Sequence, residues 1–172
     1  MKVLVVVDMQ NDFIDGALGT KEATFIVPAV IDKIESYIRS GDLVIYTKDT
    51  HPENYLETAE GKKLPVPHCI KGTHGHDIPD TILRQGYPIF EKKTFGSVEL
   101  VRYLETLNFT SVELVGLCTD ICVISNAMLI KAHFPEIPIL VDAAACAGVT
   151  PTSHSEALNT MRMCQIDVVQ EK

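Results

Sequence analysis

The stretch Ser111–Val123 reads SVELVGLCTDICV and brings a cysteine, Cys122, to the point where a strand gives way to a helix. The apolar run Val112–Val115 is typical of a buried strand, and Gly116 with a short turn separates it from an apolar helical pattern. Backbone N–H groups and the helix dipole at such a junction favour a thiolate and can hold an oxyanion. The pattern makes Cys122 a candidate nucleophile, with a buried structural cysteine as the alternative.

Short apolar runs of this kind alternate along the chain with helical patterns. Strands are predicted at Lys2–Val7, Leu43–Thr47, Val112–Val115, Ile137–Val141 and Ile166–Val169, with a weaker one at Tyr87–Phe90. Helices are predicted at Phe25–Ile38, Val98–Leu107, Ile121–His133 and from Thr150 to about Met163. This alternation predicts an α/β fold, a three-layer α/β/α arrangement around a central, mostly parallel Rossmann-like sheet. We expect a single domain over residues 1–172, with its chemistry just past the carboxyl ends of the strands.

The composition limits the classes of partner that we expect and indicates the cellular compartment. A formal net charge of −8 argues against nucleic acid and against an anionic membrane surface as partners. No apolar run reaches the ~18 residues of a membrane span, and the first apolar run is too short for a signal peptide. We therefore expect a cytoplasmic protein whose five scattered cysteines are reduced. Those away from the turn, Cys69, Cys146 and Cys164, are most simply read as small core residues.

Two charged side chains near predicted strand ends are candidates for the reaction itself. Asp8 closes the first strand, where a carboxylate is costly unless it is paired or used; a loop carboxylate capping nearby N–H groups is the alternative. Lys92 and Lys93 follow the strand-like run Tyr87–Phe90, and a lysine beside a cysteine favours the thiolate. A Lys-Lys pair is also typical of a solvated turn, so spacing alone does not separate the two readings.

The irregular region 49–80 is long enough to suggest a functional loop, and it contains candidate metal ligands. Asp49 and His51 project on the same face if the strand geometry persists, and could share a cation with His68 from a proline-stiffened segment. One Asp and two His form a ligand set suited to zinc, iron or manganese. His74 and His76 are further candidates in the same loop, and ordinary surface residues remain the alternative.

A set of short motifs follows in order along nearly the whole chain. They are VVDMQNDF from Val6, TKDTH from Thr47, PVPHCIKGTHG from Pro65, EKKTFGS from Glu91, GLCTDICV from Gly116 and DAAACAGVTPTSHSEAL from Asp142. Together and in this order they resemble the isochorismatase-like cysteine hydrolases, and within them the nicotinamidase/pyrazinamidase branch. The resemblance implies the isochorismatase-like hydrolase fold.

The resemblance also implies a catalytic triad of Asp8, Lys92 and Cys122. The aromatic-small pair Phe95–Gly96 matches the family pattern that selects Lys92 over Lys93, and the Thr-Asp-x pattern selects Cys122 over Cys118 as nucleophile. Cys118 then occupies the position whose peptide bond with the preceding residue, Leu117, is typically cis in the family. The N–H groups of Cys118 and Cys122 are implied to form the oxyanion hole.

The metal-bearing members of the family place their ligands in motifs that map to Asp49, His51 and His68. Glu60 is the nearest match to a glutamate that some members add, although its spacing to His68 is one residue longer. The resemblance implies one divalent ion, zinc first and iron or manganese as alternatives. Phe13 matches a ring-stacking position of the substrate pocket, whereas Leu64 stands where a large aromatic residue is often found.

The implied activity is hydrolysis of nicotinamide to nicotinate and ammonia through a thioester intermediate. One alternative within the family is another small amide, an N-carbamoyl compound or a ureido compound as substrate. A second alternative, from a different class, is a non-enzymatic redox or metal-binding protein that uses Cys118 and Cys122. Because related chains commonly form oligomers, we expect a homo-oligomer that binds a small-molecule amide.

Overall fold

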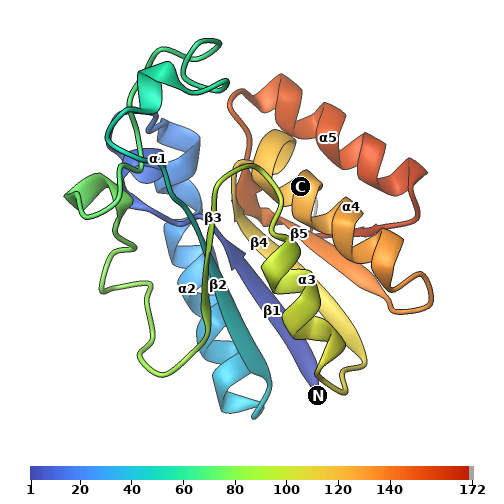
Figure 1. Ribbon diagram of the computed structural model, residues 1–172. Coiled ribbons are helices and arrows are strands. Elements are labelled where there is room, and N and C mark those ends of the chain that lie inside the picture. The colour runs from blue at the N-terminus through green and yellow to red at the C-terminus, as the bar shows by residue number, and fades with distance from the viewer. Residues whose placement is uncertain (171–172) are drawn as a thin grey trace.

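The computed structural model describes residues 1–170, in which the strands form one parallel sheet in the order β3-β2-β1-β4-β5-β6 (Figure 1). Their bounds are β1 Lys2–Val7, β2 Leu43–Asp49, β3 Ile89–Lys92, β4 Ser111–Leu117, β5 Ile139–Ala147 and β6 Asp167–Val169. Each neighbouring pair is parallel. The predicted α/β class with a central parallel sheet is confirmed.

Helices cover both faces of the sheet, which explains why its central strands read as continuous apolar runs. The helices are α1 Asn11–Ile14, α2 Lys21–Arg39, α3 Val98–Glu105, α4 Ile124–His133 and α5 Pro151–Met163. Successive β1 residues alternate between two cores: Val3, Val5 and Val7 pack with α3, α4 and α5, whereas Leu4 and Val6 pack with α2. Among the described residues, no helix combines the length and apolar character needed to span a membrane.

Helix α2 begins a full turn before its predicted start at Phe25. The hydroxyl of Thr20 accepts a hydrogen bond from the N–H of Ala23, which caps the helix at its true start. Phe25 itself is 79% exposed and lies outside the buried face of the helix. The buried face begins instead with Ala23 and Ile26.

The edge strand β3 is displaced from its predicted position by two residues. The prediction ended at Phe90, but the strand pairs with β2 through Lys92, which stands opposite Asp49. Lys92 is therefore the last strand residue rather than part of a turn after it. The apolar pattern is weak here because this strand has a neighbour on one side only.

Two further expectations need correction. The helix predicted from Ile121 is preceded by a single π-helical turn, η3 Thr119–Val123, and α4 proper starts at Ile124. Cys69 and Cys146 are buried as expected, but Cys164 is exposed, because it is the residue that ends α5 rather than a residue of its packed face.

Candidate active site

The carboxyl ends of four neighbouring strands bring the predicted side chains together. Asp8 directly follows β1, Asp49 ends β2 and Lys92 ends β3, while the turn with Cys122 follows β4. The chain leaves β1 at Asp8 with a φ of 47°, a left-handed conformation that is uncommon for a residue other than glycine. Such backbone conformations cluster at functional sites.

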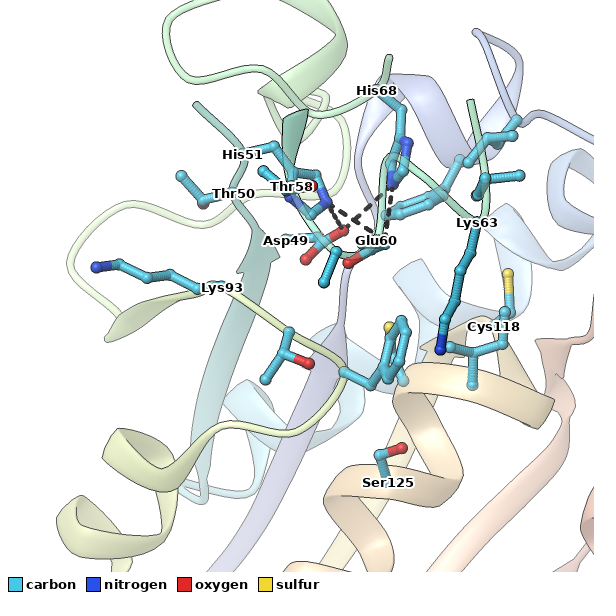
Figure 2. A pocket seen from close by; sticks show the side chains of 18 of the residues that line it. Asp49, Thr50, His51, Thr58, Glu60, Lys63, His68, Lys93, Cys118 and Ser125 are labelled. Carbon is cyan, nitrogen blue, oxygen red and sulfur yellow. Dashed lines mark hydrogen bonds and ion pairs between the residues drawn. The ribbon is translucent and has the colours of Figure 1, made fainter. Parts of the chain in front are cut away.

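Lys92 is the centre of the buried part of the site. Its Nζ lies 2.6 Å from Oδ2 of Asp8, 3.4 Å from Sγ of Cys122 and 3.3 Å from Oδ1 of Asp49. The hydroxyl of Thr47 donates a 2.6 Å hydrogen bond to Oδ1 of Asp8. Asp8 and Cys122 thus both lie beside the ammonium of Lys92, whereas Figure 2 shows Lys93 pointing away from Asp49 and His51.

Burial and charge set the ionisation of these three groups. Burial raises the pKa of Asp8, and the ammonium of Lys92 partly opposes this. Burial lowers the pKa of Lys92, but the neighbouring Asp8, Cys122 and Asp49 outweigh it and leave the pKa raised. Burial also raises the pKa of the Cys122 thiol, and Asp8 raises it further. The resting site therefore holds a neutral thiol beside a charged lysine, and the thiol needs a base to lose its proton.

The turn after β4 has an unusual backbone. The Leu117–Cys118 peptide bond is cis, as the resemblance implies. Gly116 has a φ of 115°, and a Cβ at this position would lie 2.1 Å from the carbonyl oxygen of Val7, so only glycine fits. The N–H of Val123 reaches the carbonyl of Cys118 at 3.0 Å, which closes the π-helical turn around Cys122. π-Helical turns of this kind are frequent at functional sites.

A second cluster joins the candidate metal ligands, and Figure 2 shows their side chains converging. Nε2 of His51 lies 2.9 Å from Oδ2 of Asp49, and Nε2 of His68 lies 3.5 Å from the same oxygen. Oε1 of Glu60 lies 3.7 Å from both imidazole nitrogens. Nδ1 of His68 is hydrogen-bonded to the carbonyl of Val66 at 2.8 Å, which turns its Nε2 toward the cluster.

The chemistry of this donor set fits a divalent cation. Four ligands about 2.0–2.2 Å from a tetrahedral zinc ion stand about 3.3–3.6 Å apart, close to the separations among these nitrogen and oxygen atoms. Burial raises the pKa of Asp49, but hydrogen bonds from His51 and His68 outweigh it, so the carboxylate stays ionised. The longer spacing between Glu60 and His68 does not keep Glu60 out of the cluster.

The remaining histidines of the loop lie elsewhere. His76 is buried with its Nε2 2.9 Å from the hydroxyl of Thr50, and burial lowers its pKa. His74 accepts a hydrogen bond from the side chain of Asn11 through its backbone carbonyl. Neither histidine belongs to the cluster of Asp49, which removes both as candidate ligands among the described residues.

Cys122 and the candidate metal ligands line one cavity of about 1190 Å³. Phe13 lines it with its ring centroid 5.5 Å from that of His68, and the 38% exposed Leu64 lies along its wall. Cys118 also lines the cavity, and burial raises the pKa of its thiol to about 12. Phe95, whose position in its motif distinguished Lys92 from Lys93, also lines the cavity.

Thr47 and Gln10 contact the site but were not identified from the sequence. Thr47 binds Asp8, and the side-chain amide of the fully buried Gln10 binds the backbone of Asp49. Both lie inside the quoted motifs, Gln10 two positions after Asp8 and Thr47 two positions before Asp49. A polar residue beside the end of a predicted buried strand is a signal that the sequence offers. It does not reveal the hydrogen-bond partner, because Thr47 and Asp8, like Gln10 and Asp49, are 39 positions apart.

Comparison with known proteins gives this arrangement a family. A protein-family model described as the Isochorismatase domain matches residues 2–171 of this chain. The chain belongs to the isochorismatase family. The match confirms the superfamily that the ordered motifs indicated.

Relatives within the isochorismatase family agree with this assignment. The nicotinamidase of Schizosaccharomyces pombe is 27% identical, covering 98% of this chain and 93% of that protein. The pyrazinamidase of Pyrococcus horikoshii in complex with zinc has a TM-score of 0.86 at 28% identity, covering 99% of both chains. The N-carbamoylsarcosine amidase of Thermoplasma acidophilum has a TM-score of 0.78 at 29% identity, covering 97% of this chain and 94% of that one. The isochorismatase-family assignment identifies the chain as a hydrolase.

Proposed function

We propose that this isochorismatase-family hydrolase is a metal-containing cysteine amidohydrolase that converts nicotinamide to nicotinate and ammonia through a thioester. The observation that carries the proposal is the position of Lys92, whose ammonium lies within 3.4 Å of both Asp8 and Cys122. The similarity to a nicotinamidase and to a zinc-bound pyrazinamidase supports the choice of substrate.

In the proposed reaction, Cys122 is the nucleophile and Asp8 is its base. Asp8 takes the thiol proton, and the ammonium of Lys92 stabilises the thiolate that attacks the amide carbonyl. The N–H groups of Cys118 and Cys122 hold the tetrahedral oxyanion, with each donor worth roughly 2.7–4 kcal/mol. Asp8 then returns its proton to the departing ammonia. Water hydrolyses the thioester with Asp8 again as base, which restores the thiol.

The other end of the cavity orients the ring in this proposal. Asp49, His51, Glu60 and His68 would hold a divalent ion, zinc first, which supplies a Lewis acid for the pyridine nitrogen. Phe13 and Leu64 are the proposed contacts to the ring. Since Asp49 contacts Lys92 through one carboxylate oxygen and the imidazoles through the other, the proposed binding and catalytic groups are directly connected.

Release of ammonia from nicotinamide tests the proposal. We expect turnover by the purified protein, a loss of turnover with a chelator, and recovery when zinc is restored. Cys122→Ala should abolish turnover while leaving thermal unfolding near that of the parent, and Cys164→Ser, an exposed thiol, is the matched control. Retained amidase activity in Cys122→Ala would disprove the mechanism, and absence of ammonia release by the parent would disprove the substrate.

Leu64 favours a second candidate substrate class. An aliphatic side chain at this wall gives up the ring stacking that an aromatic residue would provide, and one structural relative acts on an N-carbamoyl compound by its name. A panel of nicotinamide, pyrazinamide, N-carbamoyl amino acids and ureido acids distinguishes the classes by kcat/KM. The cytoplasmic location and the homo-oligomer remain predictions, to be checked by cell fractionation and by light scattering.

A further inference from the structure

The segment Asp8–Phe13, which comprises the loop after β1 and the start of α1, contacts both chain segments that carry the candidate metal ligands. The proposed reaction uses only Asp8 and Phe13 of its motif, DMQNDF. The side chains of Gln10 and Asp12 have no role in it, yet each reaches a distant backbone group beside a candidate ligand. These two contacts are the basis of the inference.

Gln10 holds the peptide groups on both sides of Asp49. Its Oε1 accepts from the N–H of Asp49 at 2.7 Å, and its Nε2 donates to the carbonyl of Asp49 at 2.8 Å. The same Nε2 also donates to the carbonyl of His76 at 2.9 Å. The paired residues of β1 and β2 end at Val6 and Tyr46, so the amide of Gln10 supplies the hydrogen bonds that β1 no longer provides at Asp49.

Asp12 performs a similar task beside His68. Its Oδ2 accepts from the N–H of Cys69 at 2.7 Å, and Cys69 has a φ of 46°, in the left-handed region. The chain therefore turns sharply directly after the ligand, and the carboxylate of Asp12 holds that turn. Gly75 packs so closely that a Cβ there would lie 2.1 Å from Oδ2 of Asp12, which limits the positions this carboxylate can take.

We propose that Gln10 and Asp12 are positioning residues of the metal site, which set the separation of Asp49 from His68. The inference rests on the ligand set of the proposed function and adds to it the groups that hold the ligands. Groups that orient metal ligands commonly change metal affinity by about 10–100-fold when they are removed. The segment that contains Gln10 and Asp12 begins with Asp8. It therefore also fixes the position of the metal site relative to the proposed catalytic groups Asp8, Lys92 and Cys122.

The test is zinc affinity, measured on the full chain by competition with a chromophoric chelator. Gln10→Met keeps the side-chain volume and removes every polar atom, and Asp12→Ala removes the acceptor of Cys69. We expect both to weaken zinc binding about 10–100-fold, and Asp12→Asn, which retains an acceptor oxygen, to recover most of the loss. Asn11→Ala is the matched control, since it removes a 2.7 Å hydrogen bond from the same segment to His74, which does not belong to the cluster of candidate ligands.

Activity against zinc concentration separates positioning from general damage to the fold. For a positioning role, Asp12→Ala should regain its turnover of nicotinamide when zinc is saturating, which a misfolded protein would not do. If Gln10→Met fails to fold, the comparison of zinc affinity between Asp12→Ala and Asp12→Asn tests the inference by itself. Parent-like zinc affinity in Asp12→Ala, or in a folded Gln10→Met, overturns the inference and leaves the proposed function standing. A parent protein that binds no zinc overturns the ligand set and the inference together.

Discussion

At the scale of single residues, burial raises the pKa of Asp8, and Thr47 is one of the groups, with Lys92, that oppose this increase. Its hydroxyl stabilises the charged carboxylate at 2.6 Å and so lowers the pKa of Asp8 against the larger effect of burial, which raises it. Thr47→Val should raise this pKa further. If Asp8 acts as a base, the acidic limb of the kcat/KM profile then moves to higher pH. Thr47→Ser keeps the hydroxyl and should keep the profile, and an unmoved limb in Thr47→Val would contradict the role given to Asp8.

The ordered motifs chose between residues of the same type, whereas side-chain contacts could not be predicted from the sequence. The ordered motifs singled out Lys92 over Lys93 and Cys122 over Cys118, and the structure brings Lys92 and Cys122 within 3.4 Å. Spacing alone could not make either choice, because the two lysines were equal candidates and so were the two cysteines. The partner of Thr47 could not be read from the chain, because a side-chain hydrogen bond between strand ends depends on register, which is fixed only when β1 and β2 pair.

At the scale of elements, the turn between β4 and η3 depends on a close approach to β1. A Cβ at Gly116 would lie 2.1 Å from the carbonyl oxygen of Val7, so Gly116→Ala must separate two paired central strands. We expect a loss of about 2–5 kcal/mol in the free energy of unfolding, measured in urea. Gly86→Ala is the control: its φ is also positive, at 87°, but nothing lies within 4 Å, so only about 1–2 kcal/mol should be lost. Equal losses would show that the conformation, and not the contact, requires glycine at Gly116.

The elements themselves were predicted best where they are buried on both faces. The bounds of β1 agree with the predicted Lys2–Val7, because this central parallel strand is apolar and buried at every position after Lys2. The prediction failed at the edge strand β3, which pairs on one side only, and at the start of α2, where a capping residue decides the bound. The predicted end of β5 at Val141 was also wrong, because the strand continues to Ala147 through a run rich in alanine, which has a low β propensity. The spacing of apolar residues along the sequence gives no indication of the π-helical turn η3.

At the scale of the whole molecule, the site joins the sheet to the long loop that follows β2. Asp49 and His51 stand at and after the end of β2, whereas Glu60 and His68 belong to the loop and reach the same point. The ordered motifs selected Asp49, His51, His68 and Glu60, whereas spacing alone left His74 and His76 as further candidates, since the path of the loop depends on contacts to residues of α1. A cation bound here would hold the loop against the sheet.

Zinc should therefore stabilise the folded chain and protect the loop together. A ligand that binds only the folded state at 100 times its Kd contributes about 2.7 kcal/mol, which should raise Tm by several degrees in a chain of this size. The same addition of zinc should slow proteolytic cleavage within residues 52–80. Asp49→Asn should lose both effects, because it weakens the ligand that contacts both imidazoles. Asp77→Asn alters a mostly exposed carboxylate of the same loop and should keep them. A rise in Tm that persists in Asp49→Asn would mean that zinc acts at another place, and protection of the loop without a rise in Tm would mean that the loop closes independently of global stability.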